Sequence, residues 1–172
     1  IWAWGFNPAD DPALLFPETK SISLIKENAA RCRLNATNGI LYPNSATVFG
    51  LYDVRGYEPL GLRRYSELVK AINESNGVTA GWEAVVSPAS IASPVMNMMN
   101  VCRVVSLMEL DIRGIEKTSG GPVAIFRCSG ALPRAMFYSN WRVVPKPGKT
   151  PGLLVSNSFD PSAVVFLEKP PP

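Results

Sequence analysis

The sequence has 172 residues, of which 47% are hydrophobic and 18% charged, which is enough apolar material for one core and too little charge for a disordered tail. It contains no histidine, which excludes Ser-His-Asp and Cys-His triads and any metal site that needs imidazole. Its net charge of +3 is scattered along the chain, so nucleic acid is not an expected partner.

Residues 1–18 predict an irregular N-terminal arm, because X-Pro pairs favour extended or turn backbone. The chain begins with Ile rather than Met, which predicts a processed or excised fragment. The arm is expected to follow a transmembrane segment that is not present. Trp2 and Trp4 would then suit the membrane interface, or they pack on the domain. The uncharged run 84–102 contains prolines and asparagines, so it does not predict a membrane span.

Thr19 is placed to cap a helix over 20–29, and residues 31–36 alternate between apolar and polar, which predicts a half-buried strand. The apolar face of the helix would contain Ile22, Ile25 and Ala29. A turn is expected at 38–39, followed by a short buried strand at 47–50.

The clearest helix is predicted over 62–74, with Asn76-Gly77 as its C-terminal stop. Its apolar stripe would contain Leu62, Tyr65, Leu68, Val69 and Ile72. A shorter helix is predicted near 94–100, with Ser93 as its N-cap and Pro94 in its first turn.

The remainder predicts mostly strands, at 101–107, 122–128, 135–138, 141–144 and 162–168. Residues 117–121 predict a flexible hairpin turn rather than a phosphate loop. A further turn is predicted at 146–149, and a helical turn is predicted to begin at 150–151. The expected fold is α+β, a mainly antiparallel sheet with two or three packed helices, in a single domain over 19–168 followed by a proline-rich linker at 169–172.

The three cysteines, Cys32, Cys102 and Cys128, form no CxxC pair, so no structural metal site is expected, and no cofactor either. Three buried thiols are the preferred interpretation, and one disulfide plus a free thiol is the alternative. Two glycosylation patterns occur, at Asn35-Ala36-Thr37 and Asn73-Glu74-Ser75, and they matter only in a eukaryotic secretory pathway.

The densest polar cluster is the 53–59 loop, and the candidate binding residues there and one turn further on are Asp53, Arg55, Tyr57, Glu58 and Arg64. Bidentate arginine contacts would suit a sugar or a phosphate. The preferred interpretation is structural: Arg55 pairs with Asp53 or Glu58 and holds the loop closed. A third interpretation makes Asp53 and Glu58 a glycosidase pair, but nothing else in the sequence supports it, and no catalytic residue is assigned.

Several segments together resemble the extracytoplasmic region of YfhO-like bacterial membrane proteins. The similar segments, in the family's order, are 15–19, 47–60, 64–65, 98–105, 131–135 and 159–168, whereas Cys102 and Cys128 depart from the family pattern. The resemblance implies a polytopic membrane protein with a soluble part outside the membrane, similar in architecture to lipid-linked glycosyltransferases. The acid expected to be catalytic lies in an early loop that this sequence lacks, so no catalytic residue is carried over.

The resemblance therefore implies a non-catalytic extracytoplasmic domain of a bacterial, membrane-bound, glycosyltransferase-like protein. Such a domain would assist glycan or acceptor recognition or brace the membrane part. Its expected partners are the transmembrane part of the same polypeptide and a glycan or lipid-linked sugar. The alternative is a free-standing secreted glycan-binding module.

Overall fold

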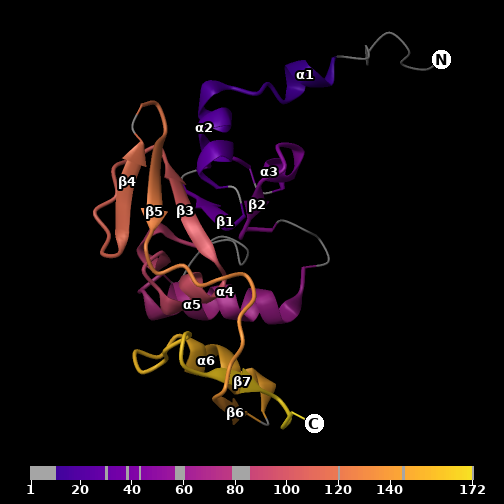
Figure 1. The fold of residues 1–172 in the computed structure, drawn as a ribbon, viewed down its shortest axis with the longest axis vertical. Coiled ribbons are helices and arrows are strands. Elements are labelled where there is room, and N and C mark those ends of the chain that lie inside the picture. Colours follow the sequence, from indigo (N-terminus) through magenta and orange to yellow (C-terminus); the bar gives the residue numbers. More distant parts are fainter. Residues whose placement is uncertain are drawn as a thin grey trace, which may run out of the picture.

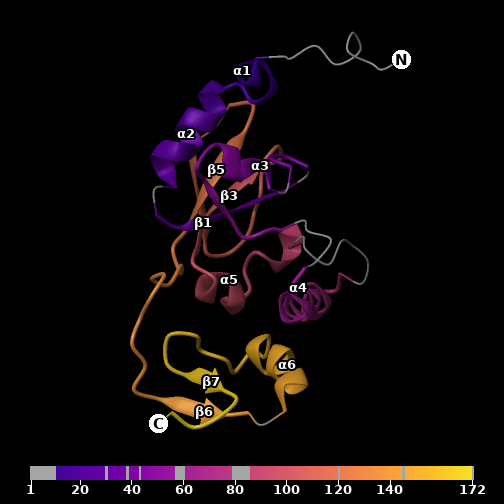
Figure 2. The ribbon, with the colours of Figure 1, turned by 90° about the vertical axis from the view of Figure 1, so that its right-hand side faces the viewer.

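The computed structural model describes residues 11–29, 31–37, 39–42, 44–56, 61–78, 86–119, 121–144 and 146–171. Its centre is a five-stranded sheet in the order β2-β1-β3-β5-β4, with helices on both faces (Figures 1 and 2). The strands are β1 (Arg33–Ala36), β2 (Tyr52–Asp53), β3 (Val101–Ser106), β4 (Ile115–Ser119) and β5 (Ala124–Cys128). The predicted α+β class is confirmed.

The sheet is mixed rather than mainly antiparallel. Strand β1 pairs in parallel with β2 and with β3, whereas β5 pairs antiparallel with β3 and with β4. The connections explain the difference, because parallel neighbours need a crossover and antiparallel neighbours can be joined by a hairpin. Helical segments separate β1, β2 and β3 in the sequence, while only the four residues 120–123 separate β4 from β5.

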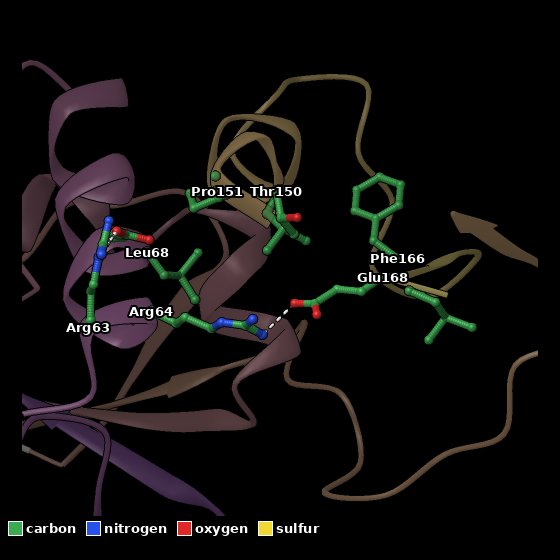
Figure 3. Close-up of a pocket in the computed structure, with 11 residues that line it drawn as sticks. Arg63, Arg64, Leu68, Thr150, Pro151, Phe166 and Glu168 are labelled. Atoms are coloured by element: carbon green, nitrogen blue, oxygen red, sulfur yellow. Dashed lines mark hydrogen bonds and ion pairs between the residues drawn. The ribbon is translucent and has the colours of Figure 1, made fainter. Parts of the chain in front are cut away.

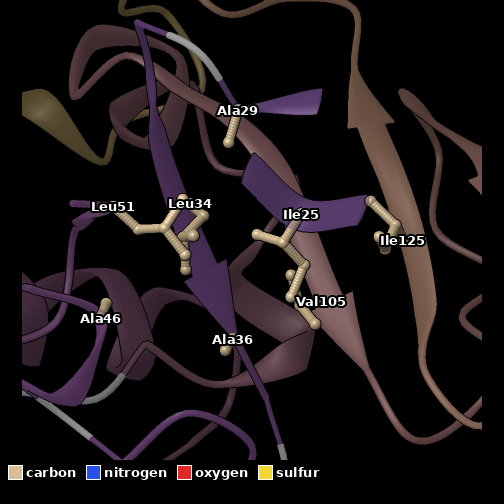
Figure 4. Close-up of a cluster of buried hydrophobic side chains, with 8 residues drawn as sticks. All are labelled: Ile25, Ala29, Leu34, Ala36, Ala46, Leu51, Val105 and Ile125. Carbon is tan, nitrogen blue, oxygen red and sulfur yellow. The ribbon is translucent and has the colours of Figure 1, made fainter. Parts of the chain in front are cut away.

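Helix α2 (Lys20–Asn28) covers one face of the sheet and confirms the helix predicted over 20–29. The side chain of Thr19 caps it, since its Oγ1 accepts a hydrogen bond from the Ile22 N–H at 3.3 Å. Ile25 and Ala29 pack on the sheet in the cluster shown in Figure 4. The other members of this buried cluster are Leu34, Ala36, Ala46, Leu51, Val105 and Ile125.

Helices α4 (Arg63–Ser75) and α5 (Pro94–Met98) pack in a second cluster, together with Val86, which precedes the 3₁₀ turn η1 (Pro88–Ser90). Both predicted helices are confirmed, and Ser93 caps α5 by accepting from the Val95 N–H. The buried members of the cluster are Val54, Val69, Ile72, Val86, Val95, Met96 and Val101. Leu62, predicted on the inner stripe, is 78% exposed because it precedes the first helical residue of α4.

The end of α4 confirms the predicted stop at Asn76-Gly77. Gly77 has φ of +77°, and its N–H donates to the Glu74 carbonyl at 3.0 Å. The N–H of Val78 donates to the Asn73 carbonyl at 2.9 Å. These two bonds satisfy carbonyls that the helix would otherwise leave unpaired, and the positive φ explains the need for glycine.

Several local predictions were wrong. Residues 47–50 do not form a strand: 47–48 are the end of helix α3 (Ser45–Val48), and 49–50 form the turn that follows it. Residues 135–138 form no strand either, and 117–119 belong to β4 rather than to a flexible turn. In the predicted irregular arm, residues 12–15 form one helical turn, α1 (Pro12–Leu15).

Strand β1 is not half-buried as its alternation predicted. Leu34, Asn35 and Ala36 are all fully buried, because helices cover both faces of the sheet. Asn73, on α4, is also buried, so neither glycosylation pattern presents its asparagine at the surface. No helix in the described part of the chain is long and apolar enough to cross a membrane.

Residues 141–168 form a smaller unit, called here the C-terminal unit, at the opposite end of the molecule from α1 (Figure 1). It contains β6 (Trp141–Val143) and β7 (Val165–Leu167), which pair in parallel, with η2 (Pro147–Lys149) and α6 (Thr150–Leu154) between them. Helix α6 packs against α4, and this contact places the C-terminal unit beside the helical layer of the main sheet.

Cys32 and Cys102 form a disulfide with a Cα–Cα distance of 5.7 Å, and Cys128 is free. The preferred prediction of three thiols was wrong, and the alternative of one disulfide plus a free thiol is correct. Cys32 directly precedes β1 and Cys102 belongs to β3, so the parallel pairing of these strands brings together two residues that lie far apart in the sequence.

Candidate functional site

Asp53 and Arg55, two of the candidate binding residues, form a buried ion pair instead of an open site. Arg55 Nη2 lies 2.7 Å from Asp53 Oδ2, and the side chains are only 3% and 5% exposed. Arg55 Nε and the Arg55 backbone N–H donate to Asp53 Oδ1 at 3.1 and 2.8 Å. This confirms the structural interpretation for Asp53 and argues against a catalytic role for its carboxylate.

The same guanidinium holds two loops together. Arg55 Nη2 also donates to the backbone carbonyls of Ile40 and Leu41, which belong to the turn after β1. The loop contacts α4 as well, because the Tyr65 hydroxyl donates to the Val54 carbonyl. Burial, with a smaller contribution from the charge of Asp53, raises the pKa of Tyr65 to about 12. Tyr57 and Glu58 lie outside the described residues.

Arg64, the remaining candidate, lines a cavity of about 400 Å³ between α4 and the C-terminal unit (Figure 3). We call this cavity the α4–β7 cleft. Its lining residues are Arg63, Arg64, Glu67, Leu68, Gly148, Thr150, Pro151, Leu154, Phe166, Leu167 and Glu168. The cleft therefore brings residues 63–68, at the start of α4, together with residues 148–168, which lie far from them in the sequence.

Two ion pairs occupy the charged side of the cleft. Arg63 Nε lies 2.7 Å from Glu67 Oε1 on the next turn of α4. Arg64 Nη1 contacts Glu168 Oε1, which follows β7, and this pair spans the cleft (Figure 3). The two arginines and two glutamates balance, so the cleft has no net charge from its lining. All four side chains are substantially exposed, so each pair stabilises the fold little.

The other side of the cleft is apolar. The Phe166 ring lies above the Arg64–Glu168 pair in Figure 3, and it is held by contact with Phe159, whose ring centroid is 5.3 Å away. A second cavity of about 440 Å³ shares Thr150, Leu154 and Phe166 with the cleft. Its lining is mainly apolar, with residues of the segment 132–138 on one side. The two cavities thus meet at Phe166.

The side chains of the cleft are suited to binding a ligand through hydrogen bonds and an apolar contact. Planar guanidinium and carboxylate groups offer paired donors and acceptors, and an aromatic ring offers a flat apolar surface. Within the part of the chain that the structure describes, no group of three or more Cys, Asp or Glu side chains is arranged to hold a metal ion.

Of the sequence-predicted site residues, the structure places Arg64 in the cleft and Asp53 and Arg55 in the buried pair. Sequence reasoning missed Glu67, Thr150, Phe166 and Glu168. The four-residue spacing of Arg63 and Glu67 was an available signal for their pairing. Nothing in the local sequence indicated that Glu168 meets Arg64, because that contact depends on the packing of α6 on α4. No family model, curated protein or solved structure matches this chain.

Proposed function

We propose that this chain is a non-catalytic extracytoplasmic domain of a membrane-bound glycosyltransferase-like protein, and that it binds a glycan in the α4–β7 cleft. The observation that carries the binding proposal is the composition of the cleft: balanced Arg–Glu pairs beside the Phe166 ring in a cavity of about 400 Å³. The membrane-protein setting is supported by the resemblance of the sequence segments to YfhO-like proteins.

A neutral sugar fits this composition better than a phosphate does. A sugar presents vicinal hydroxyls, which pair with the two donors of a guanidinium or the two acceptors of a carboxylate, and C–H faces, which pack on an aromatic ring. A phosphate would meet Glu67 and Glu168 as well as Arg63 and Arg64, and the two carboxylates would repel it. A volume of about 400 Å³ is sufficient for one or two sugar rings.

The disulfide supports an oxidising location. Disulfides persist in secreted and extracytoplasmic proteins and are rare in reducing cytosol. The Cys32–Cys102 bond is therefore consistent with a position outside the cytoplasmic membrane. It supports the free-standing secreted glycan-binding module equally well. The two candidates differ in whether the gene encodes hydrophobic segments before Ile1, and a reading of the full gene separates them.

Glycan binding is testable by NMR titration of the labelled chain with a panel of neutral and lipid-free bacterial oligosaccharides. A ligand should shift the resonances of Arg64, Thr150 and Phe166 while leaving β4 unchanged. Arg64→Ala should weaken binding about tenfold or more, since it removes a charge-assisted hydrogen-bonding group. Arg113→Ala removes another exposed arginine, which is not in the cleft lining, and should leave binding unchanged.

Phe166→Leu separates stacking from general packing, because it keeps an apolar side chain against Phe159 and removes the flat ring surface. We expect weakened binding with an unchanged unfolding temperature to within a few degrees. If neither Arg64→Ala nor Phe166→Leu changes the glycan affinity, the cleft is excluded as the glycan site. Shifts confined to another surface would exclude it as well.

A further inference from the structure

Two arginines lie directly opposite each other in the main sheet, outside the α4–β7 cleft. Arg103 of β3 is the register partner of Arg127 of β5, and Arg127 is the register partner of Glu116 of β4. Residues that are directly opposite in an antiparallel pair share a face, with Cβ atoms about 4.5–5.5 Å apart. The three side chains thus form a row of charges, positive, positive and negative, across three strands.

The hydrogen-bonding capacity of Arg103, at the β3 end of the row, is incompletely used. Arg103 Nη1 donates to the Cys102 carbonyl at 2.9 Å, but its Nε is buried without an acceptor. A buried donor of a charged group without an acceptor is destabilising, as is a like charge directly opposite. Burial, and next the charge of Arg127, lower the pKa of the Arg103 guanidinium.

Glu116 does not compensate for both cations. Its Oε2 accepts from Arg127 Nη2 at 2.7 Å, and the structure gives it no contact with Arg103. This outer pair is well exposed, so water competes with it. The row retains one positive charge that Glu116 does not compensate, carried by Arg103 of β3 and Arg127 of β5.

We propose that Arg103 and Arg127 form a binding site for a small oxyanion, a phosphate or carboxylate group that bridges the two guanidinium groups. Two oxygens on one centre match this arrangement, since each guanidinium can donate to a different oxygen of the same anion. Binding requires Arg103 to turn its free N–H groups toward Arg127. The anion and Glu116 then compete for Arg127.

The test is isothermal titration of the whole chain at constant ionic strength with three probes: inorganic phosphate, glucose 1-phosphate and glucuronate. A free-ion site should bind inorganic phosphate at least as tightly as the two sugar anions. A site for an acidic sugar should prefer glucose 1-phosphate or glucuronate. In either case, Arg127→Gln and Arg103→Gln should each weaken binding about tenfold or more.

Two further variants make the experiment specific. Arg113→Gln removes the same charge from an exposed loop and should leave the affinity unchanged. Glu116→Gln removes the competing carboxylate and should tighten binding severalfold, an effect that a merely structural role of the row would not produce. Arg127 is exposed, so Arg127→Gln should fold even if Arg103→Gln does not.

No binding by any probe, or equal binding by wild type and Arg127→Gln, would overturn the proposal. Neither result bears on the cleft, whose lining contains none of these residues.

Discussion

Arg55 surrounds the carboxylate of Asp53, two residues earlier, with three donors. Its Nη2 contacts Oδ2 at 2.7 Å, while its Nε and its own backbone N–H contact Oδ1 at 3.1 and 2.8 Å. Because the pair is nearly inaccessible to solvent, neither charge can be satisfied by water if the other is removed. The pair therefore fixes residues 53–55, directly after β2, against the turn at Ile40 and Leu41.

Arg55→Ala should lower the free energy of unfolding by about 3–5 kcal/mol, because it leaves the Asp53 carboxylate buried without its partner. Urea unfolding at neutral pH measures this change. The comparison variant is Lys117→Ala, whose pair with Glu109 is exposed and should contribute about 0–1 kcal/mol. Unchanged stability of Arg55→Ala, together with lost glycan binding, would make the 53–59 loop the binding site instead.

Asn35→Val should raise the free energy of unfolding by about 1–3 kcal/mol. The Asn35 side chain is fully buried in β1, and neither its amide nitrogen nor its amide oxygen has a hydrogen-bond partner. Valine removes both unsatisfied atoms and suits a central strand. Thermal unfolding of the variant measures the gain. A lower unfolding temperature would show that the amide is satisfied by an internal water.

Cys128 should resist thiol reagents in the folded protein. Burial raises its pKa from about 9 to about 11, so at pH 8 the reactive thiolate should be about 100-fold rarer than in the unfolded chain. Because the pKa of Cys128 is higher in the folded state, the protonated thiol contributes to the free energy of unfolding. This contribution is fully present below pH 9 and is lost as the pH rises through 11. Reaction rates with a chromogenic disulfide reagent, with and without urea, check this. Equal rates would contradict it.

Reduction of the Cys32–Cys102 disulfide should destabilise the fold by about 4 kcal/mol in the chain-entropy model, because the bond closes a loop with a sequence separation of 70. Urea unfolding of the wild type against the Cys32→Ser/Cys102→Ser double variant measures the change. Thiol counting under denaturing conditions should give one free thiol before reduction and three after it. Three thiols in protein kept oxidised would contradict the assigned pairing.

Local signals in the sequence were sufficient for the main helices. Caps and stops depend on a few neighbouring residues, so Thr19, Ser93 and Gly77 indicated the ends of α2, α5 and α4 correctly. Strand predictions failed where pairing decided the outcome. Residues 47–48 are helical despite their β-branched side chains, and the polar face of β1 is buried, which alternation along one strand cannot indicate.

The candidate site shows the same limit. The buried pair of Asp53 and Arg55 was predictable because its partners are two residues apart. The α4–β7 cleft was not predictable, because it exists only where the C-terminal unit meets α4, and this contact joins Arg64 to Glu168 through tertiary packing. Phe166 gave no signal of its own, since an aromatic residue in a short strand is ordinarily part of a core.

The buried positions of Asn35 and Asn73 affect how this protein should be produced. A eukaryotic secretory host attaches oligosaccharides at Asn-X-Ser/Thr while the nascent chain is still unfolded. A glycan added to Asn35 could not be accommodated in the central strand, and one on Asn73 would block the packing at the end of α4. Each modified molecule would fail quality control, so yields from yeast or mammalian secretion should rise when Thr37 and Ser75 are replaced by alanine.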